Sequence, residues 1–256
     1  MKILFIGDIF GQAGRKLIED HLYEIKQKYQ VDFVIANGEN AAHGKGITQR
    51  IYNDFVFQGI QAITMGNHTW AKRELFDFID DADRLIVPLN QLPTLPGVGS
   101  RVFNINGKKI RVTNLLGNTF MQPGCENPFI VMDRLLAKCN EDIHIVDFHA
   151  EATSEKIALG YYLDGRVTAV LGTHTHVPTA DARILEKHTA YITDVGMTGP
   201  LDGVIGCSKD SIIPRMLNGI PTKFEVASGK KQFNAVIIEL DSHNYATSIE
   251  RIQFYE

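Results

Sequence analysis

The chain has 256 residues, of which 44% are hydrophobic and 22% are charged, and its formal net charge is −4. This length is sufficient to bury a full core, and the composition is that of an ordinary soluble globular protein. The acidic balance argues against a generally basic surface for nucleic acids, although it leaves room for a local basic cleft.

The cysteines and the N-terminus indicate where the protein works. Cys125, Cys139 and Cys207 are odd in number and lack CxxC spacing, so we interpret them as reduced thiols of a cytosolic protein. The apolar run at residues 3–6 is too short for a signal peptide, and no apolar run is long enough to span a membrane. We therefore expect a cytoplasmic protein without membrane association.

The first third of the sequence repeats the order strand, loop, helix. Apolar runs at residues 3–6, 31–36 and 61–64 predict strands that are buried on both faces. A helical pattern covers residues 15–29, with Asp8 and Gly11 in the loop before it, and a second helix is expected to begin near Thr48, a favoured N-cap. This order predicts parallel strands joined by right-handed crossovers.

The middle of the chain changes character. Asn106-Gly107 joins two strand-like runs within residues 101–116 and predicts a hairpin. Residues 117–127 show no period and are expected to form a loop over the site. Asn127 and Pro128 have the residue types of an N-cap and a first helical position, and the helix should run to about Cys139. A strand at 143–148, a helix through 155–159 and a strand at 167–171 follow.

The last part of the chain is expected to be rich in strands. Residues 191–193 form a short strand before Asp194, and residues 212–218 form a short helix. The runs 222–226, 233–240 and 245–254 predict antiparallel strands. Because no linker rich in Pro or Ser interrupts the sequence, we expect one domain, residues 1–256, with two packed sheets and helices outside them.

Polar side chains follow apolar, strand-like runs at several places. Gly172–His176 ends one such run and carries two histidines at alternate positions; the other polar residues in this context are Asp8, Glu39, Asn40, Asn67, His68 and His149. Open α/β sheets place their sites at the carboxyl ends of strands. Taken singly, each residue could be a cap, a turn residue or a solvated side chain. Their recurrence after separate strands favours one common site.

The chemistry of this set points to metal. Seven of its members offer oxygen or nitrogen donors without a thiolate, which suits Mn, Fe or Zn better than a structural zinc site: Asp8, Glu39, Asn40, Asn67, His149, His174 and His176. These are too many donors for one ion, whereas two ions that share a carboxylate would use them all. Two such ions can hold a hydroxide between them and stabilise the attacking and leaving oxygens on phosphorus.

The ordered motifs resemble those of calcineurin-like metallophosphoesterases. They are Gly7-Asp8, Asn37-Gly38-Glu39-Asn40, Gly66-Asn67-His68, His149 and Gly172–His176. The chain differs from the common pattern at Phe10, where Asp-x-His would have its histidine, and at Glu39, where Gly-Asp is usual. Together with the segment 194–199, these departures resemble the YmdB-type branch over most of the chain. The resemblance implies a metallophosphoesterase-type double β-sheet sandwich flanked by helices.

The same resemblance implies hydrolysis of phosphodiesters, including 2′,3′-cyclic nucleotides. It assigns one metal to Asp8, Asn40 and His176, a second metal to Asn67, His149 and His174, and the bridging position to Glu39. Fe or Mn is favoured, with Zn as a further option. His68 stands beside a ligand without being needed as one, so we assign it as the general acid, with the bridging hydroxide as nucleophile.

Other functions remain open from the sequence. The same metals could serve a phosphomonoesterase, nucleotidase or protein phosphatase acting on other substrates. Alternatively, the chain could be a metal-containing regulatory or RNA-associated protein whose hydrolysis is secondary, although no stripe of basic and aromatic residues supports this reading. A small phosphodiester or nucleotide is the expected substrate. The sequence leaves open a link to RNA, a homo-oligomer formed through the C-terminal strands, and the roles of Asp194 and Thr198.

Overall fold

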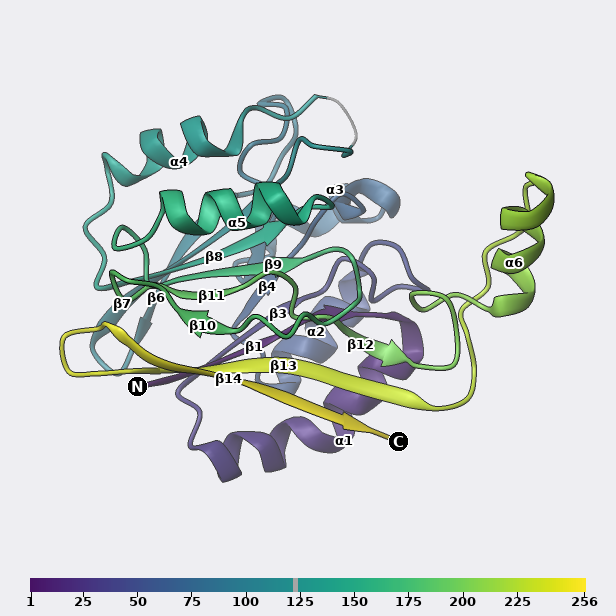
Figure 1. Ribbon diagram of the computed structural model, residues 1–256, viewed down its shortest axis with the longest axis horizontal. Coiled ribbons are helices and arrows are strands. Elements are labelled where there is room, and N and C mark those ends of the chain that lie inside the picture. Colours follow the sequence, from purple (N-terminus) through teal and green to yellow (C-terminus); the bar gives the residue numbers. More distant parts are fainter. Residues whose placement is uncertain (122–123) are drawn as a thin grey trace.

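Two β-sheets pack face to face in the computed structural model, which describes residues 1–121 and 124–256 (Figure 1). Helices cover the outer face of each sheet, so the layers run helix, sheet, sheet, helix. This arrangement confirms the expected double-sheet α/β sandwich. Within the described residues, no helix is both long and apolar enough to cross a bilayer.

The first sheet has the strand order β2-β12-β13-β1-β3-β4-β5, and β14 pairs with β13. Its strands are β1 (Lys2–Ile6), β2 (Asp8–Ile9), β3 (Phe33–Asn37), β4 (Ala62–Thr64), β5 (Leu85–Ile86), β12 (Met197–Pro200), β13 (Lys231–Leu240) and β14 (Ala246–Tyr255). The pairs β1–β3, β3–β4 and β4–β5 are parallel, which confirms the parallel strands predicted for the first third of the chain. The long pair β13–β14 is antiparallel, as predicted.

The second sheet has the order β10-β11-β9-β8-β7-β6. Its strands are β6 (Ser100–Ile105), β7 (Lys108–Leu116), β8 (Ile143–His149), β9 (Ala169–Thr173), β10 (Arg183–Ile184) and β11 (Ala190–Ile192). The hairpin β6–β7 turns at Asn106 and Gly107, whose φ angles are 51° and 81°, as a tight hairpin turn requires. Strands β7, β8 and β9 are parallel, so their carboxyl ends lie at one edge.

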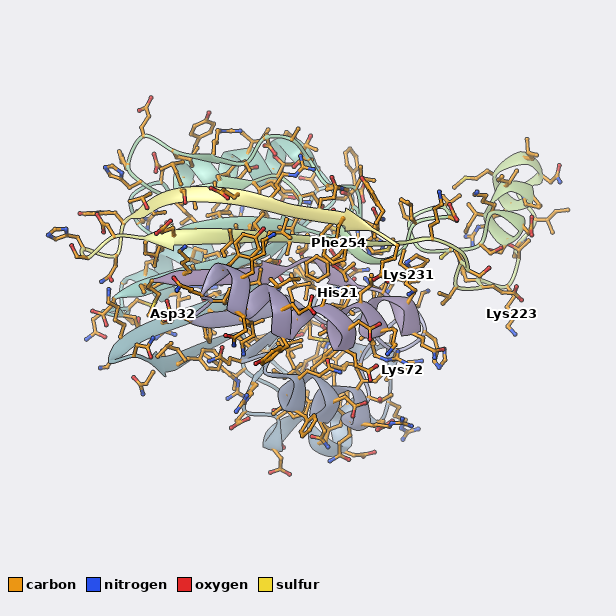
Figure 2. The ribbon with its side chains drawn as sticks, turned by 90° about the horizontal axis from the view of Figure 1, so that it is seen from below. His21, Asp32, Lys72, Lys223, Lys231 and Phe254 are labelled. Atoms are coloured by element: carbon orange, nitrogen blue, oxygen red, sulfur yellow. The ribbon has the colours of Figure 1, made fainter. Side chains whose placement is uncertain are left out.

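Helices α1 (Gly11–Tyr29), α2 (Gln49–Gln58) and α3 (Leu75–Phe78) cover the first sheet, and α4 (Pro128–Leu136) and α5 (Thr153–Tyr162) cover the second. Two 3-10 turns, η1 (Thr69–Ala71) and η2 (Ile79–Asp81), flank α3. Helix α1 packs against β12 and β13. In Figure 2, His21 of α1 lies close to Phe254 of β14, and the two ring centres are 4.9 Å apart. Helix α6 (Lys209–Asn218) projects away from the body (Figure 1).

The core between the sheets explains the continuous apolar runs. Phe5 and Phe33 point from the first sheet towards Val112, Ile145 and Leu171 of the second, and all five are buried. Because side chains alternate along a strand, the intervening residues of β1 and β3 pack under the helices instead. Both faces of these strands are therefore apolar, which produces runs without alternation.

The predicted helix starts are confirmed at two places. Thr48 Oγ1 accepts a hydrogen bond from the Ile51 amide at the start of α2, and Asn127 Oδ1 accepts one from the Phe129 amide at the start of α4. An N-cap side chain of this kind satisfies an amide that has no partner inside the helix.

Two predictions near the N-terminus need correction. Asp8 lies in the short strand β2 rather than in a loop, because it pairs with Met197 of β12. Helix α1 begins at Gly11, four residues before the predicted start. Gly11 has a φ of 58° and its amide bonds to the Asn40 carbonyl, so tertiary contacts set this helix start.

The predicted strand at residues 222–226 is wrong. Within it only Val226 makes a bridge, an isolated one to Cys207. Phe224, Glu225 and Val226 instead line a cavity. The predicted loop at 117–127 has no regular strand or helix in its described part, whereas Pro123 lies outside the described residues.

Candidate metal and catalytic site

The structure brings all eight predicted site residues to one edge, where strands of both sheets end. Asp8 lies in β2, Glu39 and Asn40 follow β3, Asn67 and His68 follow β4, His149 ends β8, and His174 and His176 follow β9. Hydrogen bonds or close contacts join each of them to another member of the set. The eight residues therefore lie together, although they come from the ends of separate strands.

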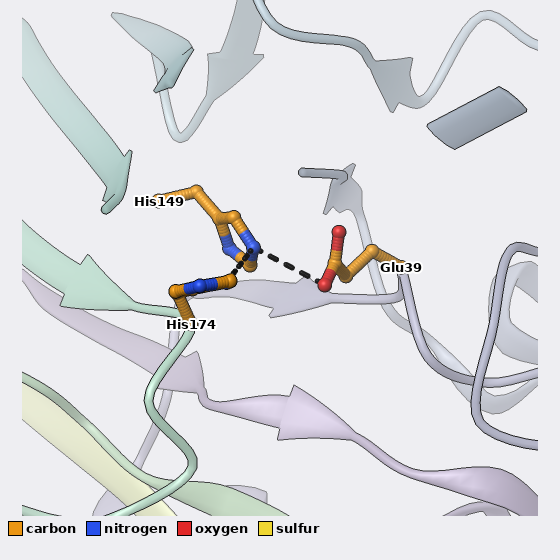
Figure 3. Close-up of side chains that lie close together, drawn as sticks. All are labelled: Glu39, His149 and His174. Atoms are coloured by element: carbon orange, nitrogen blue, oxygen red, sulfur yellow. Dashed lines mark hydrogen bonds and ion pairs between the residues drawn. The ribbon is translucent and has the colours of Figure 1, made fainter. Parts of the chain in front are cut away.

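Three donor atoms converge around the Nε2 atom of His149. Figure 3 shows two of them, which come from Glu39 and His174. This nitrogen lies 2.9 Å from Asn67 Oδ1, 3.1 Å from Glu39 Oε1 and 3.0 Å from His174 Nδ1. One imidazole nitrogen carries a single proton or a single lone pair, so it cannot satisfy three partners. Ligands that each lie about 2.0–2.2 Å from an ion are separated by roughly these distances. The cluster therefore fits a metal ion.

A second group adjoins the first. Asp8 Oδ1 is buried without a hydrogen-bond partner among the described residues, and it lies 3.8 Å from His176 Nε2. The Asn40 amide nitrogen is 3.0 Å from His176 Nε2 and 3.0 Å from Glu39 Oε1. To bind a metal through oxygen, the Asn40 side-chain amide would have to rotate by about 180°. This rotation exchanges the positions of its nitrogen and oxygen and hardly alters the shape of the side chain. His176 Nδ1 faces the Ile205 carbonyl at 2.9 Å, which leaves Nε2 directed at the site.

The buried carboxylates of the cluster favour a positive charge beside them. Burial favours a raised pKa for Glu39, but His149 and His68 outweigh burial and hold it at about 2. Burial likewise opposes the charge on His149, yet Glu39, Asp8 and Asp147 raise its pKa to about 9. Burial raises the pKa of Asp8. A proton on His149 thus balances buried carboxylates, and a bound cation could take over that role.

Gly66 allows the two sheets to meet at the cluster. A Cβ atom at this position would lie 2.3 Å from Glu39 Oε2 and 2.5 Å from His149 Nε2. Such distances are far below van der Waals contact, so any larger residue would force the two side chains to move. The Gly-Asn-His motif therefore needs its glycine for close approach of the backbone.

Two residues that orient His149 were not predicted from the sequence. Its Nδ1 atom is 2.9 Å from Thr173 Oγ1, and that hydroxyl donates to Asp147 Oδ1 at 2.7 Å. Asp147 is fully buried and also accepts hydrogen bonds from Thr64 and Asn37. The available signal was the spacing, because Asp147 stands two residues before His149 and so shares its strand face.

The two histidine positions of Gly172–His176 depend on a distorted loop. His174 and His176 have φ angles of 104° and 66°, in the left-handed region that non-glycine residues seldom adopt. Between them, the Thr175 amide and hydroxyl both donate to Asp194 Oδ2, at 3.0 and 2.8 Å. Asp194 therefore stabilises the conformation of the loop at residues 174–176, a role that the sequence left open.

Thr198, whose role the sequence also left open, connects two strands of the first sheet. Its hydroxyl donates to the Asn234 carbonyl at 3.0 Å and accepts from the Asn234 amide at 3.1 Å, which joins β12 to β13.

Phe10 packs edge-on to His176, with ring centres 5.5 Å apart, so an aromatic contact occupies the place of the missing histidine.

A cavity of about 680 Å³ opens beside the cluster. Polar and basic residues on its wall include His68, Lys45 and Lys72. The His68 amide donates to Glu39 Oε2 at 2.9 Å, which fixes the backbone of this residue to the cluster. Burial lowers the pKa of the His68 ring, and the charge of Lys45 acts in the same direction. His68 thus borders both the donor cluster and the space available to a substrate.

A two-sheet α/β sandwich that gathers carboxylates, amides and imidazoles at its strand ends has the architecture of a metallophosphoesterase. A 5'-nucleotidase precursor from Thermus thermophilus shares the fold at a TM-score of 0.55 and 10% identity, covering 99% of this chain and 54% of that one. The chain belongs to the YmdB-like protein family, whose model matches residues 4–252.

Two relatives resemble nearly the whole chain. A 2',3'-cyclic-nucleotide 2'-phosphodiesterase of Bacillus subtilis (strain 168) is 51% identical over 255 residues, which are 98% of this chain and 96% of that protein. The crystal structure of a phosphatase from Mycoplasma pneumoniae superimposes with a TM-score of 0.96 at 44% identity, covering 100% of this chain and 94% of that one. These findings confirm the family that the motifs had indicated.

Proposed function

We propose that the protein is a metal-dependent phosphodiesterase that hydrolyses phosphodiesters such as 2′,3′-cyclic nucleotides. The observation that carries the proposal is the convergence of Glu39, Asn67 and His174 on the Nε2 atom of His149, all within about 3 Å. The name of the Bacillus subtilis relative supports this substrate class. The cavity beside the cluster supplies room for a nucleotide.

Two ions fit the donor set better than one. Asn67, His149 and His174 would hold one ion, and Asp8, Asn40 and His176 would hold the other. Glu39 would bridge them, since its Oε1 atom lies 3.1 Å from His149 Nε2 and 3.0 Å from the Asn40 amide nitrogen. Oxygen donors beside imidazoles favour Fe or Mn, with Zn as a further option. When bound, the ions supply an activated water and neutralise charge on the phosphoryl oxygens.

His68 is the residue that we assign to the leaving group. Its backbone is fixed to Glu39 while its ring borders the cavity, so it can reach a departing oxygen without acting as a ligand. Burial lowers the pKa of this ring in the protein alone. An anionic phosphate nearby would favour the charged imidazole, which can then donate its proton to the leaving oxygen.

We also propose that residues 1–256 act as a single domain. The core between the sheets combines residues from the N-terminal strand, the middle of the chain and the C-terminal hairpin, among them Ile3, Ile145 and Ala246. Removal of either end of the chain would therefore expose this core.

The test is hydrolysis of 2′,3′-cyclic AMP by protein loaded with Mn or Fe, with a chelator as control. His68→Ala should lower turnover by about 10²–10⁴-fold while the metal content stays near that of the native protein. The matched control is His243→Ala, because His243 is 78% exposed and distant in sequence from every site residue. An unchanged rate in His68→Ala would remove this residue from the proton-donor role.

A comparison of substrates separates the remaining alternatives. The proposal predicts faster hydrolysis of the cyclic diester than of adenosine 3′-monophosphate. The reverse order would favour a phosphomonoesterase. Metal-loaded protein that hydrolyses neither compound but binds RNA would favour the regulatory alternative.

A further inference from the structure

The cavity beside the metal-ligand candidates has an apolar wall that the proposed chemistry does not use. Ile205, Phe224 and Val226 contribute this wall, and they come from the segments on either side of α6. Phe224 is 47% exposed, which is unusual for a large aromatic side chain inside a cavity. An aromatic surface of this kind is available to a ligand.

The two arms of the projecting α6 segment are joined to each other at its base, and one arm contacts the body. Cys207 and Val226 form an antiparallel bridge, and the Ser208 amide bonds to the Glu225 carbonyl at 2.8 Å. The carbonyl oxygen of Ile205 lies 2.9 Å from His176 Nδ1. Phe224 therefore directly precedes Glu225, whose backbone is held by Ser208. The other arm of the same α6 segment contacts His176, a metal-ligand candidate, through Ile205. Figure 1 shows that the helix itself extends beyond this base.

Two cations hold the Phe224 ring from different elements. The Arg215 guanidinium of α6 lies 5.0 Å from the ring centre, and the Lys45 ammonium of the body lies 5.4 Å from it. Both distances are typical of cation–π contacts. The ring is therefore oriented, yet almost half of the residue's surface remains open.

Lys45 has no carboxylate partner within 4.0 Å in the part of the chain that the structure describes. It stands between Gly44 and Gly46, whose φ angles are 86° and 74°, and a Cβ atom on Gly44 would lie 2.7 Å from the Phe10 ring. The glycines thus let the loop lie close against Phe10, with Lys45 on the wall of the cavity. An ammonium in this position suits an anionic ligand.

We propose that Phe224 and Lys45 form a nucleotide subsite, in which the Phe224 ring stacks on the nucleobase and the Lys45 ammonium contacts the phosphate. The inference rests on the proposed function, since it names the part of a nucleotide that each residue recognises. Stacking on an aromatic ring is tolerant of base identity because every base has a π face. The subsite therefore selects nucleotides over phosphoesters without a base, and it discriminates little among the four bases.

The experiment measures equilibrium binding, so that it does not depend on turnover. Calorimetry would compare adenosine 3′-monophosphate with glycerol 2-phosphate, which carries a phosphate but no base, on metal-loaded protein. We expect the native protein to bind the nucleotide at least about tenfold more tightly. Phe224→Ala should remove most of this preference, and Phe224→Tyr should retain it. Phe57→Ala is the matched control, because that ring on α2 is 92% exposed and should not affect the preference.

Lys45→Met tests the second half of the subsite. It should weaken both ligands by a similar factor, about tenfold, and leave the preference for the nucleotide. A native protein without preference, or a Phe224→Ala variant that keeps it, would overturn the stacking role. A Lys45→Met variant that binds both ligands normally would overturn the phosphate role. Hydrolysis of 2′,3′-cyclic AMP by the same preparations reports separately on the proposed function.

Discussion

The buried ammonium of Lys156 lies 2.7 Å from Asp194 Oδ2, directly beneath the loop that carries His174 and His176. It also donates to the Thr173 carbonyl at 2.7 Å. Both charged side chains are almost completely buried, at 1% and 0% exposure. Asp194 uses the same carboxylate to hold Thr175. One buried ion pair thus links helix α5 to the shape of the loop that presents two metal-ligand candidates.

Breaking this pair should destabilise the protein and loosen the loop together. Lys156→Met leaves the Asp194 carboxylate buried without its cation, which typically costs about 3–5 kcal/mol. We expect a lower urea midpoint of unfolding and a lower metal content in the folded protein. The control is Lys16→Met, because Lys16 and Asp20 are 2.7 Å apart but exposed. Loss of such a surface pair costs less than about 1 kcal/mol. Equal effects of the two variants would contradict the role given to Lys156.

The hydroxyl of Thr173 should control metal affinity through His149. It lies between Asp147 and His149, so Thr173→Val would remove the group that fixes the orientation of the imidazole. Loss of a residue that orients a ligand commonly lowers metal affinity by about 10–100-fold. Thr173→Ser keeps the hydroxyl and should restore most of the affinity. Competition titration with a chromogenic chelator measures the change, and equal affinity in the valine variant would argue against this orientation.

Strong local signals made much of the fold predictable. Asn106-Gly107, Thr48 and Asn127 each determine a turn or a helix start through their own backbone or side-chain chemistry, and the structure has all three. The pairing of β2 with β12 was not predictable, because it joins Asp8 to Met197 from the other end of the chain. A two-residue strand carries no period of its own to reveal it.

The site shows the same division between local and distant causes. Residues such as His149 and His174 could be found because each directly follows or ends an apolar run. Lys156 could not, because a lysine in a helical pattern normally faces solvent, and its burial depends on Asp194 from a distant segment. Phe224 was assigned to a strand that does not exist, because a short apolar run does not show whether a partner strand lies beside it.

Gly66→Ala should disrupt the proposed metal site. The added Cβ would lie 2.3 Å from Glu39 Oε2 and 2.5 Å from His149 Nε2, so these two side chains must separate. We expect metal affinity to fall by at least about tenfold, since ligands have to be held close to their ideal geometry. Metal content after dialysis, measured by atomic emission, reports the loss.

Gly107→Ala provides the comparison for Gly66→Ala. Its Cβ would meet nothing within 4 Å, but its φ of 81° makes any side chain strained. This variant should lose about 1–2 kcal/mol of stability and keep its metal. If both glycine variants kept their metal equally well, close approach at Gly66 would not matter for the site.

His144 should make stability depend on pH below neutrality. Its ring is buried in β8 with Nε2 2.8 Å from Thr113 Oγ1, and burial lowers its pKa to about 3, with Arg111 acting in the same direction. The unfolded chain has a histidine pKa of about 6.5, so it binds this proton more readily than the folded protein does. The contribution to stability is therefore complete above about pH 6.5 and is lost as the pH falls from about 6.5 towards about 3.

The measurement is urea unfolding of the native protein and of His144→Gln between about pH 7 and about pH 5. Glutamine keeps a polar group for Thr113 but cannot titrate, so the difference between the two proteins isolates His144. Below about pH 6, the native protein should lose up to about 1.4 kcal/mol more per pH unit than the variant. Because only the difference in slope is compared, a general loss of stability in the variant does not affect the result. Parallel curves would show that His144 is protonated as easily in the folded protein as in the unfolded chain.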